Sequence, residues 1–221
     1  MGSGVVARFG SAADGDLSIE AEPAGLAARR AAICPYPWTW LRQVHGATVV
    51  VVEHPGDHAG AQADAAVTAV PGAALAIQSA DCAPVLFEGG DSGGVSIVGA
   101  AHAGWRGLEA GVLEATVAAI RSLGGDGVCA RLGPCISPAA YAFGTADLTR
   151  LAFRFGPDVV GATSAGGPAL DLRANVRRVL ADLGVPLDET EVRCTALDPG
   201  WFSWRGRAEH GRQASVIWME P

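Results

Sequence analysis

Residues 63–87, ADAAVTAVPGAALAIQSADCAPVLF, decide the fold, because they contain three strand-length apolar runs and little else. The runs lie at 64–69, 73–79 and 84–88, and a fourth follows at 95–101. Most of them are apolar on both faces, which is typical of strands that lie between two layers. The sequence therefore predicts a sheet that is covered on both sides.

Helical patterns flank these strands. A helix is expected at 24–33, a long one at 108–123 ending at Gly124, and one that begins at Thr145. A further helix at 172–183 has an apolar stripe, with Asp171 placed to cap it. More strands are expected at 47–53, 128–132, 190–195 and 214–219. Because helices and strands are interleaved, the expected class is α/β or α+β with helices covering sheet faces.

The composition limits what the chain can be. Its 221 residues are 49% hydrophobic, which suits a single domain spanning 1–221. The net charge of −7 and the lack of a basic run argue against nucleic acid as a partner. No apolar run is long enough for a membrane span, and the opening residues do not resemble a signal peptide. Five widely spaced cysteines, an odd number, favour reduced thiols in the cytoplasm.

Three side chains that can bind a metal stand at predicted strand ends: His45, Cys82 and His102. Their local sequences are RQVHG (42–46), SADCAP (79–84) and AHAGWRG (101–107). Imidazole and thiolate are ligands that zinc prefers, and three of them leave a fourth position open. The same residues also allow a metal-free nucleophile, since a nearby histidine lowers a thiol pKa. The spacing along the chain does not separate these two interpretations.

Neighbouring residues suggest further roles. Arg106 precedes the helix expected at 108, where a guanidinium and free N–H groups suit an anion or a local salt bridge. Asp81 is a candidate general base, a partner that orients a histidine, or a turn cap. The remaining histidines are expected in solvated loops: His54, His58 and His210. Three cysteines are expected to pack in the core: Cys34, Cys129 and Cys194.

In this order the motifs resemble the laccase-domain family, also called the multicopper polyphenol oxidase or YfiH-like family. The resemblance covers roughly 40–219 and rests on QVHG, the 63–87 stretch, AAHAGWRG, RLGPCISPAAYAFG, LDLRANV, CTALDPGWFSWR and RQASVIWM. It implies a four-layer α/β/β/α fold with mixed sheets. It also implies a metal site at His45, Cys82 and His102, commonly zinc, with copper as the alternative. The family is associated with phenol oxidation, phosphorolysis of adenosine- and inosine-type nucleosides, adenosine deamination and, in some bacterial members, peptidoglycan-precursor editing.

The histidine count favours nucleoside chemistry over multicopper oxidation. Several coppers need many histidine ligands, whereas the chain has five His and two Met. The hypothesis is a zinc-dependent purine nucleoside enzyme, monomeric or homodimeric. In it, the metal activates water for deamination. For phosphorolysis, Arg106 holds phosphate facing the ribose, Asp81 manages a proton, and Gln43 orients the base or sugar.

Two departures from the family pattern leave other functions open. The N-terminal segment is expected to be shortened, since residues 8–20 keep only a trace of the usual family sequence. In the GPCISPAAYAFG stretch, small residues replace a Cys pair and a Glu that are common in the family: Ser137, Ala139, Ala140 and Ala142. A divergent, non-catalytic paralogue that keeps its metal therefore remains an alternative, as does the metal-free cysteine hydrolase.

Overall fold

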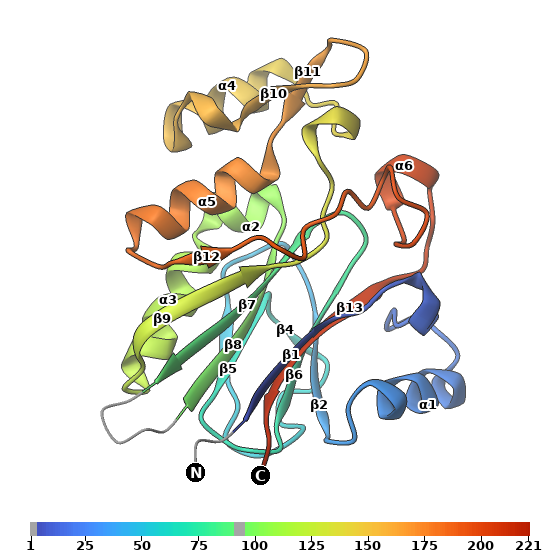
Figure 1. Cartoon of the computed structure of the whole chain (residues 1–221), viewed down its shortest axis with the longest axis vertical. Helices are drawn as coiled ribbons and strands as arrows, with labels where there is room; N and C mark the ends of the chain where they lie inside the picture. The colour runs from blue at the N-terminus through green and yellow to red at the C-terminus, as the bar shows by residue number, and fades with distance from the viewer. Residues whose placement is uncertain (1–3, 91–95) are drawn as a thin grey trace.

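The computed structural model describes residues 4–90 and 96–221 and shows two sheets stacked between layers of helices (Figure 1). The first sheet has the order β1-β13-β6-β2-β4. Its strands are β1 (Val5–Phe9), β13 (Gln213–Met219), β6 (Ala74–Ser79), β2 (Trp38–Arg42) and β4 (Ala61–Gln62). The β1-β13-β6 pairs are antiparallel, and β2 runs parallel to both β6 and β4. This sheet is therefore mixed.

The second sheet has the order β12-β9-β7-β8-β5-β3. Its strands are β12 (Leu187–Asp188), β9 (Asp126–Leu132), β7 (Ala83–Gly90), β8 (Ser96–Ala103), β5 (Ala65–Thr68) and β3 (Val49–Val51). The central pairs are antiparallel, whereas the two edge strands pair in parallel. This sheet is also mixed, as the family resemblance implied.

Three hydrophobic cores join four layers. Helix α1 (Pro23–Ile33) packs Leu26 and Ile33 on the outer face of the first sheet, against Trp38 and Trp218. The second core fills the space between the two sheets. Strand β6 serves both cores, because Ala74 and Ala76 face α1 while Leu75 and Ile77 face the second sheet. The predicted burial on both faces is thus confirmed, and so is the α/β/β/α architecture.

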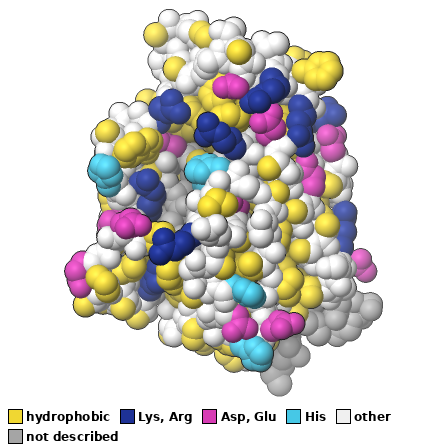
Figure 2. Space-filling view, turned by 180° about the vertical axis from the view of Figure 1, so that it is seen from behind, with side chains coloured by type: hydrophobic (Ala, Val, Ile, Leu, Met, Phe, Trp, Pro, Cys, Tyr) yellow, Lys and Arg dark blue, Asp and Glu magenta, His cyan; other side chains and the backbone are white. Residues whose placement is uncertain are grey.

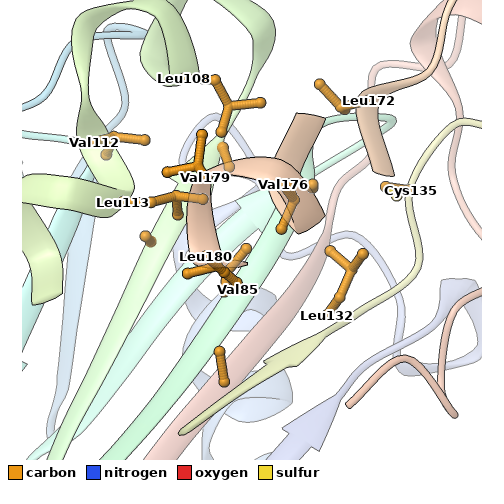
Figure 3. Close-up of a cluster of buried hydrophobic side chains, with 14 of the residues drawn as sticks. Val85, Leu108, Val112, Leu113, Leu132, Cys135, Leu172, Val176, Val179 and Leu180 are labelled. Carbon is orange, nitrogen blue, oxygen red and sulfur yellow. The ribbon is translucent and has the colours of Figure 1, made fainter. Parts of the chain in front are cut away.

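The third and largest core lies under four helices on the outer face of the second sheet (Figure 3). They are α2 (Trp105–Ala110), α3 (Val112–Ser122), α4 (Thr145–Phe155) and α5 (Leu172–Asp182). The apolar stripe on α5 belongs to the same core as Val85 of β7 and Leu132 of β9 (Figure 3). The Asp171 carboxylate accepts from the Ala174 N–H at 2.9 Å. The predicted helix boundaries of α1, α4 and α5 are confirmed within one or two residues.

Other predictions were wrong. The single helix expected at 108–123 is two helices, because Gly111 adopts a left-handed conformation with φ of 93°. The strand expected at 190–195 is a run of turns and irregular chain. Strand β2 was not expected, since its sequence follows a Pro-rich break, and the hairpin β10 (Val160–Ala162) to β11 (Pro168–Leu170) was also missed.

The remaining elements are short. They are the 3-10 turns η1 (Ala12–Asp14), η2 (Pro138–Ala140) and η3 (Pro157–Val159), and the one-turn helix α6 (Trp204–Arg207). Within the described ranges, no helix combines the length and apolarity that crossing a bilayer requires.

Candidate metal centre

The three candidate ligands lie where strands β2, β6 and β8 end, on one side of the stacked sheets. His45 lies in the turn after β2, Cys82 lies between β6 and β7, and His102 lies near the end of β8. Their ligand atoms all fall within 4.8 Å of one another. The Cys82 Sγ lies 3.8 Å from His45 Nε2, and the two imidazole rings meet edge to face with centroids 4.8 Å apart. The structure therefore brings together three side chains that are far apart in sequence.

A buried carboxylate, Asp64, organises two of the three side chains. It is fully buried, and its Oδ1 lies 2.9 Å from His102 Nδ1. Its two oxygens also accept from the backbone N–H groups of Val44, His45 and Gly46, at 2.7–3.1 Å. Three successive N–H groups around one anion fix the turn and stabilise the left-handed conformation of His45, whose φ is 59°.

The contact with Asp64 also fixes the His102 tautomer. A carboxylate within hydrogen-bond distance of Nδ1 favours the proton on that nitrogen in the neutral imidazole, so it is the Nε2 lone pair that a metal can bind. Metal-binding histidines in proteins are commonly oriented in this way. Sequence reasoning missed Asp64; the available signal was an acidic residue directly before a strand that is apolar except for Thr68.

The backbone beside the cluster leaves no room for a larger residue than glycine. A Cβ at Gly104 would lie 2.8 Å from His45 Cδ2 and 3.0 Å from Cys82 Sγ. The φ and ψ of Gly104, −75° and 163°, are open to any residue, so the constraint is space and not conformation. The close approach of this backbone is what lets the imidazole and the sulfur converge.

Charge in the cluster favours a thiolate. Burial alone would raise the pKa of the Cys82 thiol, but the neighbouring His102 and His45 lower it to about 6. Burial would lower the pKa of His102, but Cys82 and Asp64 raise it to about 9. Two imidazoles and a thiolate form a donor set that suits zinc, and the cluster faces a cavity on one side.

This cavity has a volume of about 790 Å³ and is lined by all three side chains. Figure 2 shows the hollow, with histidine and basic side chains around it; the sequence has no lysine, so every basic side chain there is an arginine. Aromatic side chains from three segments also line it: Trp105, Tyr141 and Trp204. A volume of this size accommodates a drug-sized or nucleoside-sized molecule.

Two arginines face the cavity from aromatic platforms. The Arg106 guanidinium lies 4.4 Å from the Trp105 ring centroid, and that of Arg205 lies 5.2 Å from the Tyr141 ring centroid. Neither forms an ion pair with a described carboxylate. Burial and then the charge of Cys82 raise the pKa of Tyr141 to about 12, so its hydroxyl stays protonated. Arg205 and Tyr141 lie within stretches that carry the family resemblance, but they were not singled out.

The two other predicted site residues are engaged with the protein itself. The Gln43 side chain donates from Nε2 to the Gln78 carbonyl at 2.7 Å and accepts from the Gln78 N–H at 2.9 Å. The Asp81 carboxylate accepts from the Thr195 and Ser203 hydroxyls, each at 2.7 Å, and from the Arg205 N–H at 2.6 Å. Both residues line the cavity, and Asp81 anchors the segment that carries Arg205.

The other histidines divide into two groups. His54 and His58 lie in the exposed loop before β4 and do not line the cavity. His210 is exposed as expected, yet it lines the cavity and meets the Trp204 ring edge to face with centroids 5.1 Å apart.

These features define a class of protein: four-layer α/β/β/α proteins in which a His-Cys-His cluster faces a large cavity at the ends of the strands. The family model described as multi-copper polyphenol oxidoreductase laccase matches residues 11–220. The chain belongs to this family, and the resemblance expected from its motifs is confirmed.

Curated relatives carry the name purine nucleoside phosphorylase. One from Mycobacterium bovis is 38% identical, over 90% of this chain and 81% of the relative. The YfiH protein of Escherichia coli is 39% identical, over 81% of this chain and 73% of the relative. Among solved structures, protein NMB0706 of Neisseria meningitidis aligns with a TM-score of 0.79 at 31% identity, covering 99% of this chain and 91% of that one. YfiH of Bacillus licheniformis, at 24% identity and a TM-score of 0.81, supports the fold; the alignment covers 98% of this chain and 93% of that one.

Proposed function

We propose that this chain is a metal-dependent purine nucleoside phosphorylase that splits adenosine- or inosine-type nucleosides with phosphate. One observation carries the proposal: the His45–Cys82–His102 cluster opens on a cavity that is also lined by Arg106 and Arg205, neither of which pairs with a described carboxylate. The relatives named purine nucleoside phosphorylase support the choice of substrate class.

The metal would be held by His45, Cys82 and His102. The ligand set suits a zinc ion better than it suits copper for redox chemistry. One site with a thiolate and two imidazoles is enough to bind a redox-inert Lewis acid. When bound, the ion supplies Lewis acidity at its open coordination position. The space left by Gly104 and the free Nε2 of His102 both fit such an ion.

The protein's own groups would bind phosphate beside the cluster. Arg106 and Arg205 supply two fixed positive charges, and guanidinium groups match phosphate oxygens in pairs. The protonated Tyr141 hydroxyl can donate a further hydrogen bond. In the reaction, a phosphate oxygen bonds to C1′ of the ribose as the C1′–N9 bond breaks. The products are ribose 1-phosphate and the free base, and the base takes up a proton as it leaves.

In this proposal Asp81 positions Arg205. Its carboxylate already accepts from three donors of the 195–205 segment, so moving it would release that segment. Gln43 likewise holds the end of β6 and does not touch the substrate.

The test combines metal analysis with turnover. Wild-type protein should contain about one zinc per chain and convert inosine or adenosine to free base only when phosphate is present. Cys82→Ala should lose both the metal and turnover, whereas Arg106→Gln should keep the metal and raise the KM for phosphate about tenfold or more. His54→Gln and Arg178→Ala, at exposed positions outside the cavity, are matched controls.

Three outcomes would contradict the proposal. Full turnover by metal-free wild-type protein would favour a cysteine nucleophile. Base release without phosphate would indicate hydrolysis. Metal-loaded wild-type protein that converts no purine nucleoside would favour a non-catalytic paralogue.

A further inference from the structure

Gln78 is a buried polar residue of the cavity wall to which the proposed reaction assigns no role. Its exposed fraction is 6%, and it stands near the carboxyl end of β6, three residues before Asp81. Alternate residues of a strand lie on the same face of the sheet, so the Gln78 side chain lies on the face of Ala74 and Ala76, which is the face covered by α1. It lines the same cavity as the metal cluster, together with Leu41, Ser18 and Ser79.

The backbone of Gln78 is held rigidly. Strand β2 pairs with β6 only as far as Trp40 and Ala76, so its backbone no longer reaches Gln78. The Gln43 side chain takes over this pairing, since its amide bonds to both the N–H and the carbonyl of Gln78. On the other side, Ala214 of β13 lies opposite Gln78. A ligand-binding group on such a strand is positioned more accurately than one on a loop.

The side-chain amide, by contrast, has an unmet requirement. The Gln78 Nε2 is buried and forms no hydrogen bond with any described residue. A buried donor without an acceptor is unfavourable, and such groups are uncommon in folded proteins. Since the residue forms part of a cavity wall, a bound molecule with an acceptor at this point would satisfy it.

We propose that the Gln78 amide recognises the nucleobase of the substrate, by pairing with the N1–C6 edge of a purine. This inference rests on the proposed function. A primary amide presents a donor and an acceptor side by side. That pair matches the N1–H and 6-oxo group of hypoxanthine and, after rotation of the amide, the N1 and 6-amino group of adenine. Gln78 would thus accept both purine types and exclude bases that lack this edge.

The experiment compares two nucleosides that differ at this edge. Inosine carries N1–H and a 6-oxo group, whereas purine riboside lacks the 6-substituent and so cannot form the paired contact. Their dissociation constants are measured by calorimetry for wild-type protein loaded with zinc and for Gln78→Leu. Gln62→Leu is the matched control, because Gln62 is an exposed residue at the edge strand of the same sheet and does not line the cavity.

Wild-type protein and the control should bind inosine about tenfold or more tightly than purine riboside, and Gln78→Leu should lose this preference. The phosphate dissociation constant should stay the same in all three proteins. Gln78→Met, which keeps the length of the side chain, serves if the leucine variant fails to fold by circular dichroism.

The outcomes separate the two ideas. An unchanged preference in the Gln78 variants would overturn the role of Gln78 and leave the proposed function standing. Wild-type protein that binds neither nucleoside would overturn both.

Discussion

Replacement of Asp64 by asparagine should weaken the metal site while all three candidate ligands stay in place. In the structure, Oδ1 accepts from the His45 N–H and lies 2.9 Å from His102 Nδ1, while Oδ2 accepts from Val44 and Gly46. An asparagine can present its oxygen to only one of these pairs. The better arrangement keeps Val44 and Gly46 and turns the NH₂ group toward His45 and His102.

That arrangement changes the His102 tautomer. The asparagine NH₂ would donate to Nδ1, so the imidazole proton moves to Nε2 and the lone pair for the metal is lost. The His45 N–H would be left without an acceptor, which costs about 1–3 kcal/mol, and the loss of charged hydrogen bonds adds to this cost. We therefore expect the free energy of unfolding of the metal-free protein to fall by about 2–4 kcal/mol. Zinc affinity should fall about 10- to 100-fold or more.

Two measurements test this. Competition with a coloured chelator gives the zinc dissociation constant. Nitrogen–proton NMR of the metal-free protein, recorded above the His102 pKa of about 9, reports which ring nitrogen of the neutral His102 carries the proton. The control is Asp57→Asn, since Asp57 pairs with His54 Nδ1 at 3.1 Å in an exposed loop away from the cavity. An Asp64→Asn protein with wild-type zinc affinity, or one that keeps the proton on Nδ1, would refute the reasoning.

Three further predictions follow from the site. Gly104→Ala should lower zinc affinity about tenfold or more, because the added Cβ would meet His45 and Cys82. The control Gly144→Ala should leave the affinity unchanged, because a Cβ at this helix start meets no atom of the described residues within 4 Å. Equal zinc affinities of the two variants would contradict the packing argument. In chelator-treated protein, the rate of Cys82 alkylation, followed by mass spectrometry, should rise between about pH 5 and about pH 7, because the thiol with a pKa of about 6 ionises there. Cys135 should stay unlabelled over this range, because burial raises its pKa to about 12. Labelling of Cys82 that began only near pH 9 would disprove this. Asp81→Asn should keep at least about a tenth of kcat if Asp81 positions the 195–205 segment, whereas a loss of about a hundredfold or more, measured by base release, would identify it as the proton-transfer group.

The central strands were predictable because they are mostly apolar runs of strand length. β5, β6, β7 and β8 lie where the 63–87 stretch and residues 95–101 placed them. β2 was missed because the Pro-rich stretch at 35–38 predicted a break in the chain, although the Trp and Thr residues that follow favour a strand. Gly111 was expected inside a helix because a single glycine is tolerated there. In the structure it has a left-handed conformation that ends α2 and begins α3.

The candidate site was partly predictable. Histidine and cysteine have few roles, so His45, Cys82 and His102 stood out once the family motifs were recognised. Asp64 and Gln78 did not stand out, because an acid or an amide at the end of a strand is usually solvated, and only the fold shows that both are buried. Gln43 and Asp81 were expected to meet the substrate, but the structure shows their polar atoms bonded to the protein.

The three candidate ligands come from both sheets. His45 follows β2 and Cys82 follows β6 in the first sheet, while His102 belongs to β8 in the second. An ion held by all three would therefore cross-link the two sheets where these strands end. By mass action, a hundredfold excess over its dissociation constant would add about 2.7 kcal/mol to the native state. The melting temperature of the protein would then follow the free zinc concentration in the medium, even with no nucleoside present.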